Sequence, residues 1–129
     1  MITADQLVAH AIGDYVLQSD WMANEKTKKS VAALAHVVTY TAPFLWLTRS
    51  PLALAIILGS HFVIDRWRLA RYVCWAKNWL APERNRPWSE CSATGYSPDR
   101  PAWLAVWLLI IADNVMHVVI NGLAIQHFG

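Results

Sequence analysis

The chain has 129 residues, of which 56% are hydrophobic and 16% are charged, and its formal net charge is +2. That length predicts one domain over residues 1–129, and the hydrophobic share is high for a soluble protein of this size, so we expect an integral membrane protein. The small net charge argues against binding to a nucleic acid polymer. Cys74 and Cys91 lack the spacing of a redox or zinc motif, and we expect both to be free thiols.

Two apolar segments in the first part of the chain predict membrane helices. The first covers residues 2–22, where Thr3 and Gln6 can form a capping box. The second, Ser30–Leu47, is just long enough to span a bilayer. Both are nearly free of charged side chains.

Two further segments complete an expected four-helix transmembrane bundle. The third starts at Leu52, is apolar through Ile64 and continues to Leu80 with alternating basic and aromatic residues, which predicts an amphipathic interfacial extension of that helix. Residues 81–101 contain four of the six prolines and predict a loop. The fourth segment, Ala102–Ile125, is long enough to span. The predicted fold class is therefore all-α.

The basic residues predict the orientation in the membrane. The connection with Lys26, Lys28 and Lys29 is basic, whereas the connection between the second and third segments has only Arg49. The region after Ile64 is also basic and carries Arg66, Arg68, Arg71, Lys77, Arg84, Arg86 and Arg100. By the positive-inside rule both termini then face away from the cytoplasm. No cleavable signal peptide is expected, because Asp5 stands where a basic cluster would be needed.

Histidine and aspartate recur four residues apart inside the apolar segments. The pairs are His10 with Asp14, His61 with Asp65, and Asp113 with His117. Four residues is the helical spacing that stacks two side chains on one face, where an imidazole and a carboxylate can share one metal ion. An aspartate at membrane depth costs roughly 2.5 to 3.5 kcal/mol, so a compensating cation is expected. In the expected topology, these residues meet in the cytoplasmic leaflet.

His36, the lone histidine of the second segment, joins these pairs in a predicted metal centre. On its own such a residue more often hydrogen-bonds within a protein core. The expected ligands are His10, Asp14, His36, His61, Asp65, Asp113 and His117.

The ligand types narrow the metal and the chemistry. Nitrogen and oxygen ligands without thiolate suit zinc first, with manganese, iron or nickel as alternatives, and seven ligands indicate two ions. The glutamates lie outside the apolar segments, which disfavours a di-iron centre, and the aspartates disfavour haem. We therefore expect hydrolysis of a phosphoester, in a lipid headgroup or a nucleotide, by a metal-activated water.

Other polar residues are expected to support this site. Four lie on or beside the ligand stripes and are expected to orient the ligands: Gln18, Tyr40, Asn114 and Asn121. Lys26 and Arg68, at the expected cytoplasmic mouth, could bind an anionic substrate or leaving group. The expected partners are membrane lipid and an anionic small molecule or lipid, and oligomerisation stays open.

These motifs resemble a known family. Four stretches carry the resemblance: the run from His10 through Asp14 and Gln18 to Ala23, followed by Lys26; Leu34-Ala-His36 with Tyr40; His61 to Asp65 with Arg68; and Asp113 to His117. Together they resemble the bacterial and phage family called domain of unknown function 3307. The resemblance covers nearly the whole chain and implies a protein of the bacterial inner membrane. It also implies a relation to predicted membrane-bound, LexA-regulated metal-dependent hydrolases and, more distantly, to zinc-dependent phospholipase C. Asn114 and Arg68 replace a glutamine and a lysine of the family pattern, which puts the finer substrate contacts in question.

Two alternatives stay open. The protein could be a non-enzymatic membrane protein, with a structural metal or a His/Asp relay, and a phage-encoded form could act by binding a host membrane component. It could also be a soluble helical bundle, which high salt or alkali would release from membranes.

Overall fold

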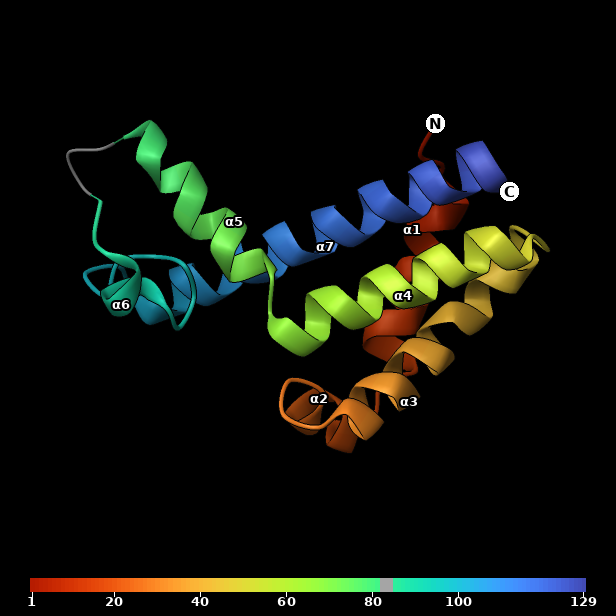
Figure 1. Ribbon diagram of the computed structural model, residues 1–129, viewed down its shortest axis with the longest axis horizontal. Coiled ribbons are helices and arrows are strands. Elements are labelled where there is room, and N and C mark those ends of the chain that lie inside the picture. Colours follow the sequence, from red (N-terminus) through yellow and green to blue (C-terminus); the bar gives the residue numbers. More distant parts are fainter. Residues whose placement is uncertain (82–84) are drawn as a thin grey trace. The chain divides into compact units, whose positions relative to one another are not determined.

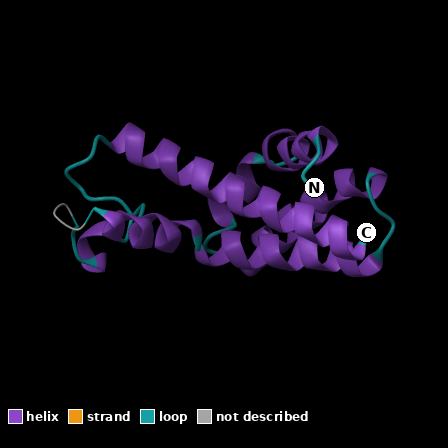
Figure 2. Cartoon of the chain, turned by 90° about the horizontal axis from the view of Figure 1, so that it is seen from above, coloured by secondary structure: helices purple, strands orange, loops and turns teal. Residues whose placement is uncertain are grey.

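A computed structural model describes residues 1–81 and 85–129, and within these ranges the chain forms helices and no strand (Figures 1 and 2). The all-α prediction is confirmed for this part. The chain divides into two compact units: the first unit, Met1–Trp67 with His117–Gly129, and the second unit, Arg68–Met116. Helix α7, Ala102–Phe128, is continuous and contributes residues to both. Residues 82–84 of the expected loop lie outside the described residues.

Short helices make up the N-terminal part of the first unit. They are α1 (Ala4–Ala11), the π-helical turn η1 (Ile12–Val16) and α2 (Asp20–Glu25). The predicted capping box is confirmed, because the Gln6 amide donates to the Thr3 hydroxyl and the Thr3 amide donates to the Gln6 side chain. The expected first segment is interrupted before Ser19, whose hydroxyl caps α2.

Two longer helices and part of α7 complete the first unit. They are α3 (Ser30–Thr41), which the 3-10 helix η2 (Ala42–Trp46) extends, and α4 (Pro51–Trp67), which packs on α3. Pro43 lies at the start of η2, where a residue without an N–H group is tolerated. Among the described helices α7, with 27 residues, is the one long and apolar enough to cross a membrane. The other three expected spans stay predictions.

The first unit has a polar interior and an apolar surface. All the polar or charged side chains that are buried in the described chain belong to this unit, and they include His36 and His61, both with 0% exposure. Large apolar side chains such as Val31, Leu34 and Val38 are exposed. Contiguous apolar surface of this kind is typical of a protein that faces lipid or a partner.

The second unit begins where α4 ends. Arg68 has a φ of 53°, a left-handed conformation that a non-glycine residue in a regular helix does not adopt, so α5 (Ala70–Lys77) is a separate helix and not an extension of α4. The 3-10 helix η3 (Asn78–Leu80), the short helix α6 (Trp88–Cys91) and the start of α7 follow. Cys74 and Cys91 are free, as expected, and both are buried.

Gly13 allows η1 to approach α3 closely. A Cβ at this position would lie 2.5 Å from Cδ2 and 2.9 Å from the carbonyl oxygen of Tyr40. Because Tyr40 is fully buried and its backbone cannot retreat, we expect Gly13→Ala to lower the free energy of unfolding by about 1 to 3 kcal/mol. Thermal unfolding in detergent measures the change. Gly59→Ala is the matched control: a Cβ there meets nothing within 4 Å, so that variant should unfold at the wild-type temperature or higher.

Candidate metal centre

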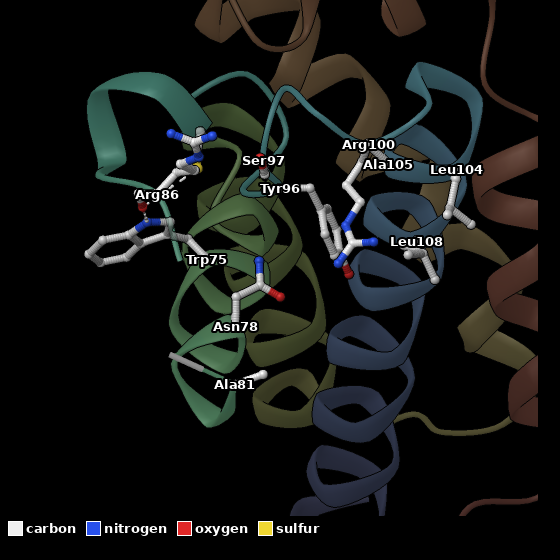
Figure 3. Close-up of a pocket in the computed structure, with 11 residues that line it drawn as sticks. Trp75, Asn78, Ala81, Arg86, Tyr96, Ser97, Arg100, Leu104, Ala105 and Leu108 are labelled. Atoms are coloured by element: carbon white, nitrogen blue, oxygen red, sulfur yellow. Dashed lines mark hydrogen bonds between the residues drawn. The ribbon is translucent and has the colours of Figure 1, made fainter. Parts of the chain in front are cut away.

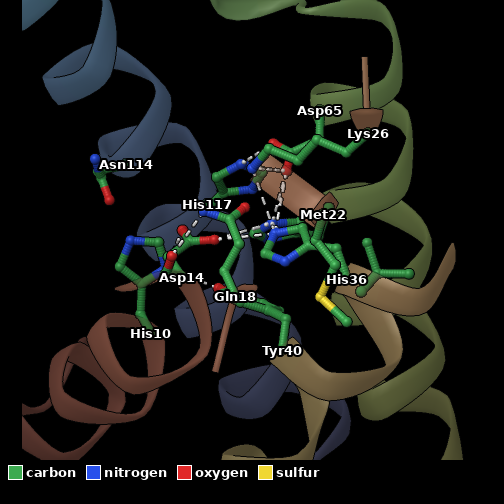
Figure 4. Close-up of polar contacts among 12 residues, drawn as sticks. His10, Asp14, Gln18, Met22, Lys26, His36, Tyr40, Asp65, Asn114 and His117 are labelled. Atoms are coloured by element: carbon green, nitrogen blue, oxygen red, sulfur yellow. Dashed lines mark hydrogen bonds and ion pairs between the residues drawn. The ribbon is translucent and has the colours of Figure 1, made fainter. Parts of the chain in front are cut away.

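Four side chains from three elements converge in the first unit (Figure 4). Asp14 comes from η1, His36 from α3, and His61 and Asp65 from successive turns of α4. His36 Nε2 lies 3.0 Å from His61 Nε2. Each of these nitrogens lies 3.2 to 3.3 Å from Asp14 Oδ1 and 3.2 Å from Asp65 Oδ2. We call these four residues the His-Asp cluster.

The spacing within the His-Asp cluster fits a metal ion. Ligand atoms about 2.1 Å from one ion lie about 3.0 Å apart at neighbouring positions of an octahedron and about 3.4 Å apart in a tetrahedron. Five of the six separations among the four ligand atoms, at 3.0 to 3.3 Å, fall in that range. The sixth joins Asp14 Oδ1 to Asp65 Oδ2 and is at most 4.8 Å. The four atoms can therefore surround one ion.

The partners of the two carboxylates also favour a bound metal ion. Asp14 Oδ1 and Asp65 Oδ2 are buried, and neither accepts a hydrogen bond of ordinary geometry from the described residues, although the Lys26 ammonium pairs with Asp65 Oδ2. Buried carboxylate oxygens nearly always have a donor or a cation as partner. Two such oxygens that face two imidazole nitrogens form the donor set that a divalent ion prefers.

His10 and His117 contact the outer carboxylate oxygens of the His-Asp cluster. His117 Nε2 lies 3.2 Å from Asp65 Oδ1, and His10 Nδ1 lies 3.5 Å from Asp14 Oδ2. Each aspartate thus directs one oxygen to the centre and the other to a further histidine. Partners of this kind fix the orientation of a ligand. The four converging atoms could hold one ion, and the expectation of two ions stays a prediction.

Tyr40 joins this outer layer to α7. Its hydroxyl accepts a hydrogen bond from Asn121 Nδ2 at 2.6 Å and lies 2.8 Å from His10 Nδ1. Its ring packs against that of His61, with the centroids 3.7 Å apart. Tyr40 and Asn121, two of the residues predicted to orient the ligands, therefore bond to each other beside His10 and His61.

Lys26 is the cation beside the His-Asp cluster. Its ammonium lies 2.7 Å from Asp65 Oδ2 and 3.4 Å from His36 Nε2, and the side chain is 18% exposed. Arg66 steadies the turn that follows Lys26 by donating to the Thr27 carbonyl oxygen at 2.7 Å. The sequence alone did not single out Arg66, although its position directly after Asp65 is a signal that could have done so.

Three of the remaining predicted site residues donate to main-chain carbonyl groups. Gln18 donates to the main-chain carbonyl of Asp14 and not to its carboxylate. In the second unit, Asn114 donates to the Ile110 carbonyl and Arg68 to the Ala93 carbonyl. Asp113 also belongs to the second unit, one helical turn before His117 on α7.

The net charge of the His-Asp cluster favours a bound cation. Its two carboxylates have side-chain exposures of 10% and 3%, and among the described residues one ammonium, that of Lys26, lies against them. Two buried negative charges beside one positive charge leave a net negative charge at low dielectric, which is costly. A bound cation would offset that negative charge.

Comparison with known proteins gives a family and no characterised relative. No curated protein and no solved structure matches the chain significantly. A family model described as "Protein of unknown function (DUF3307)" matches residues 2–127, which is nearly the whole sequence, so this protein belongs to that family.

Proposed function

We propose that this protein is a membrane-embedded, divalent-metal-dependent hydrolase that acts on a phosphoester. The observation that carries the proposal is the buried His-Asp cluster, in which two imidazole nitrogens and two carboxylate oxygens face one point with Lys26 beside them. Zinc is the first expectation for the ion, and manganese, iron and nickel suit the same ligands. The relation to LexA-regulated hydrolases stays a prediction.

Membrane residence rests on two features. Helix α7 is long and apolar enough to span, and the helices around the His-Asp cluster expose Val31, Leu34 and Val38 while they bury polar groups. Lipid is the solvent that suits such a surface. We therefore place the first unit in the bacterial inner membrane, with the site in the cytoplasmic leaflet and both termini on the other side. Retention in the membrane pellet at alkaline pH is the expected result, and release would contradict it.

The neighbouring residues suit hydrolysis of an anionic substrate. A bound divalent ion would acidify a water molecule and polarise a phosphoryl oxygen. The Lys26 ammonium, at the partly exposed edge of the His-Asp cluster, would attract and orient the phosphate, while His10 and His117 hold the outer oxygens of the two aspartates. The deep burial of the cluster would limit the access of bulk water.

One observation favours a second candidate, a structural metal. Four ligands satisfy a tetrahedral ion completely, and catalytic sites usually keep a position open for water. An octahedral ion held by the same four atoms would instead keep two positions free. The two functions therefore differ in whether exchangeable water binds the ion.

A phosphoester assay separates these candidates. Detergent-purified protein should release phosphate or alcohol from at least one member of a panel of phospholipids, nucleotides and aryl phosphates. A chelator and Asp65→Asn should each abolish that activity. Asp5→Asn, which alters an exposed aspartate in the first turn of α1, should keep it. A protein that binds metal but is inactive on the whole panel would support the structural metal and refute the hydrolase.

A further inference from the structure

The second unit contains a cavity of about 250 Å³ (Figure 3). Leu104, Ala105 and Leu108 of α7 give it an apolar wall, and Tyr96 and Arg100 also line it. At about 30 Å³ per water molecule, the volume equals that of roughly eight waters, which is enough for a phosphate group and the atoms attached to it. An apolar wall together with a cationic side chain suits an amphiphile.

One of the two arginines that line the cavity, Arg100, makes no ion pair with the described residues, although Asp99 feels its charge. Arg86 donates to Asp99 at 2.9 Å, and the hydrogen bonds from Arg86 and Ser97 hold the pKa of Asp99 below its usual value, so this pair is charged and balanced. The Arg100 guanidinium makes neither a hydrogen bond nor an ion pair with the residues that the structure describes. It is therefore available to an anion.

Tyr96 supplies a second donor at this position. Its hydroxyl is buried and makes no hydrogen bond of ordinary geometry within residues 1–81 and 85–129, and its polar neighbours are Lys77 and Cys74. Tyr96 and Arg100 both line the cavity (Figure 3). A buried hydroxyl and a guanidinium without an acceptor are the groups that an anionic oxygen would satisfy.

The position of the cavity along α7 indicates where its ligand comes from. Arg100 lies two residues before Ala102, the first residue of the candidate span. Leu108 lies about 9 Å beyond Ala102 along the helix axis, at 1.5 Å per residue. Trp103 and Trp107 are 67% and 59% exposed, as in the aromatic belt at a membrane surface. The cavity thus extends from the depth of lipid headgroups to the depth of the first acyl carbons.

The charge of the second unit favours a lipid that is negative overall. Its described residues include five basic side chains and three acidic ones: Arg68, Arg71, Lys77, Arg86 and Arg100 against Glu90, Asp99 and Asp113. Basic side chains at a membrane surface attract anionic over zwitterionic lipids.

We propose that this cavity binds an anionic glycerophospholipid. Arg100 and the Tyr96 hydroxyl hold the phosphate, and Leu104 and Leu108 contact the first carbons of an acyl chain. The inference rests on the membrane insertion of α7 in the proposed function and not on the metal centre. Loss of lipid binding would therefore leave the metal content and the phosphoesterase activity unchanged.

Native mass spectrometry of the detergent-purified protein tests the site. We expect phosphatidylglycerol, added with an equal amount of phosphatidylcholine of the same chain length, to give the more abundant adduct. Arg100→Gln should lower the apparent affinity for phosphatidylglycerol about tenfold, because it removes a charged hydrogen bond. Leu108→Trp, which fills the cavity without a change of charge, should also weaken the adduct.

Two controls make the result specific. Arg49→Gln removes an exposed arginine of the first unit and should leave the adduct unchanged. Inorganic phosphate at millimolar concentration should not displace the lipid. Equal adducts of both lipids, full binding by Arg100→Gln, or displacement by phosphate alone would each overturn the proposal. Wild-type metal content in Arg100→Gln would show that the variant is folded.

Discussion

Replacing His61 with alanine is expected to reduce the bound divalent metal from about one ion per chain to a small fraction of that. His61 Nε2 lies within 3.3 Å of three other ligand atoms, and the side chain is completely buried, so no solvent-exposed group can replace it. Loss of a direct ligand should cost more than the roughly 10- to 100-fold in affinity that loss of an outer partner costs. Elemental analysis after dialysis measures the change.

The stability of the same variant distinguishes lost metal from lost packing. The His61 ring stacks on that of His117 and packs at a tilt against that of Tyr40, with the centroids 3.8 and 3.7 Å apart. Truncation therefore also leaves a cavity, which lowers the unfolding temperature of the metal-free protein. Added metal should raise the unfolding temperature of the wild type but not that of the variant. His127→Ala, at an exposed position of α7, is the control and should keep both the metal and the shift. An equal shift in His61→Ala would contradict the assignment.

Replacing Lys26 with methionine is expected to strengthen metal binding about tenfold and to weaken the binding of an anionic substrate. The Lys26 ammonium occupies Asp65 Oδ2 at 2.7 Å, so a metal ion at that oxygen must overcome like-charge repulsion. Without the ammonium, Asp65 Oδ2 can coordinate the ion without competition. The substrate phosphate then lacks its cationic partner, so KM should rise. Isothermal titration with metal and a KM measurement test the two effects.

Lys28→Met provides the matched control for Lys26. The Lys28 side chain is 68% exposed and pairs with Glu25 at 3.7 Å, an exposed contact that contributes little. This variant should bind metal and substrate as the wild type does. If Lys26→Met bound metal more weakly than the wild type, the ammonium would be supporting the site and not competing for it.

The sequence predicted which residue types would meet, but not which atoms. The spacing of His61 and Asp65 on one helix correctly placed two side chains together, at 3.2 Å. His36, weak as a signal by itself, lies at the centre of the His-Asp cluster. Its position depends on the packing of α3 on α4, which no local spacing encodes.

The pair of His10 and Asp14 shows why local spacing is insufficient. These residues are four apart, yet Asp14 directs Oδ1 toward His36 and His61 and leaves only Oδ2 for His10. The intervening helix changes to a π-helical turn at Ile12, which alters the direction of the side chains that follow. Nothing in the hydrophobic pattern marks that change, although Gly13 permits the close contact that accompanies it.

Helix boundaries were predicted well where the signals were local. The capping box at Thr3 and the start of the last helix at Ala102 were correct. The continuous helix expected beyond Asp65 was wrong, because Arg68 adopts a left-handed conformation that basic and aromatic periodicity cannot reveal.

The central claim is that His36, His61, Asp14 and Asp65 bind one divalent ion. X-ray absorption at the edge of the metal in the purified protein tests it most directly. The expected spectrum has nitrogen and oxygen neighbours at about 2.0 to 2.2 Å, no sulfur, and outer scattering from two imidazole rings. A spectrum that contains sulfur or no imidazole, or a purified protein that retains no divalent metal after loading, would contradict the claim.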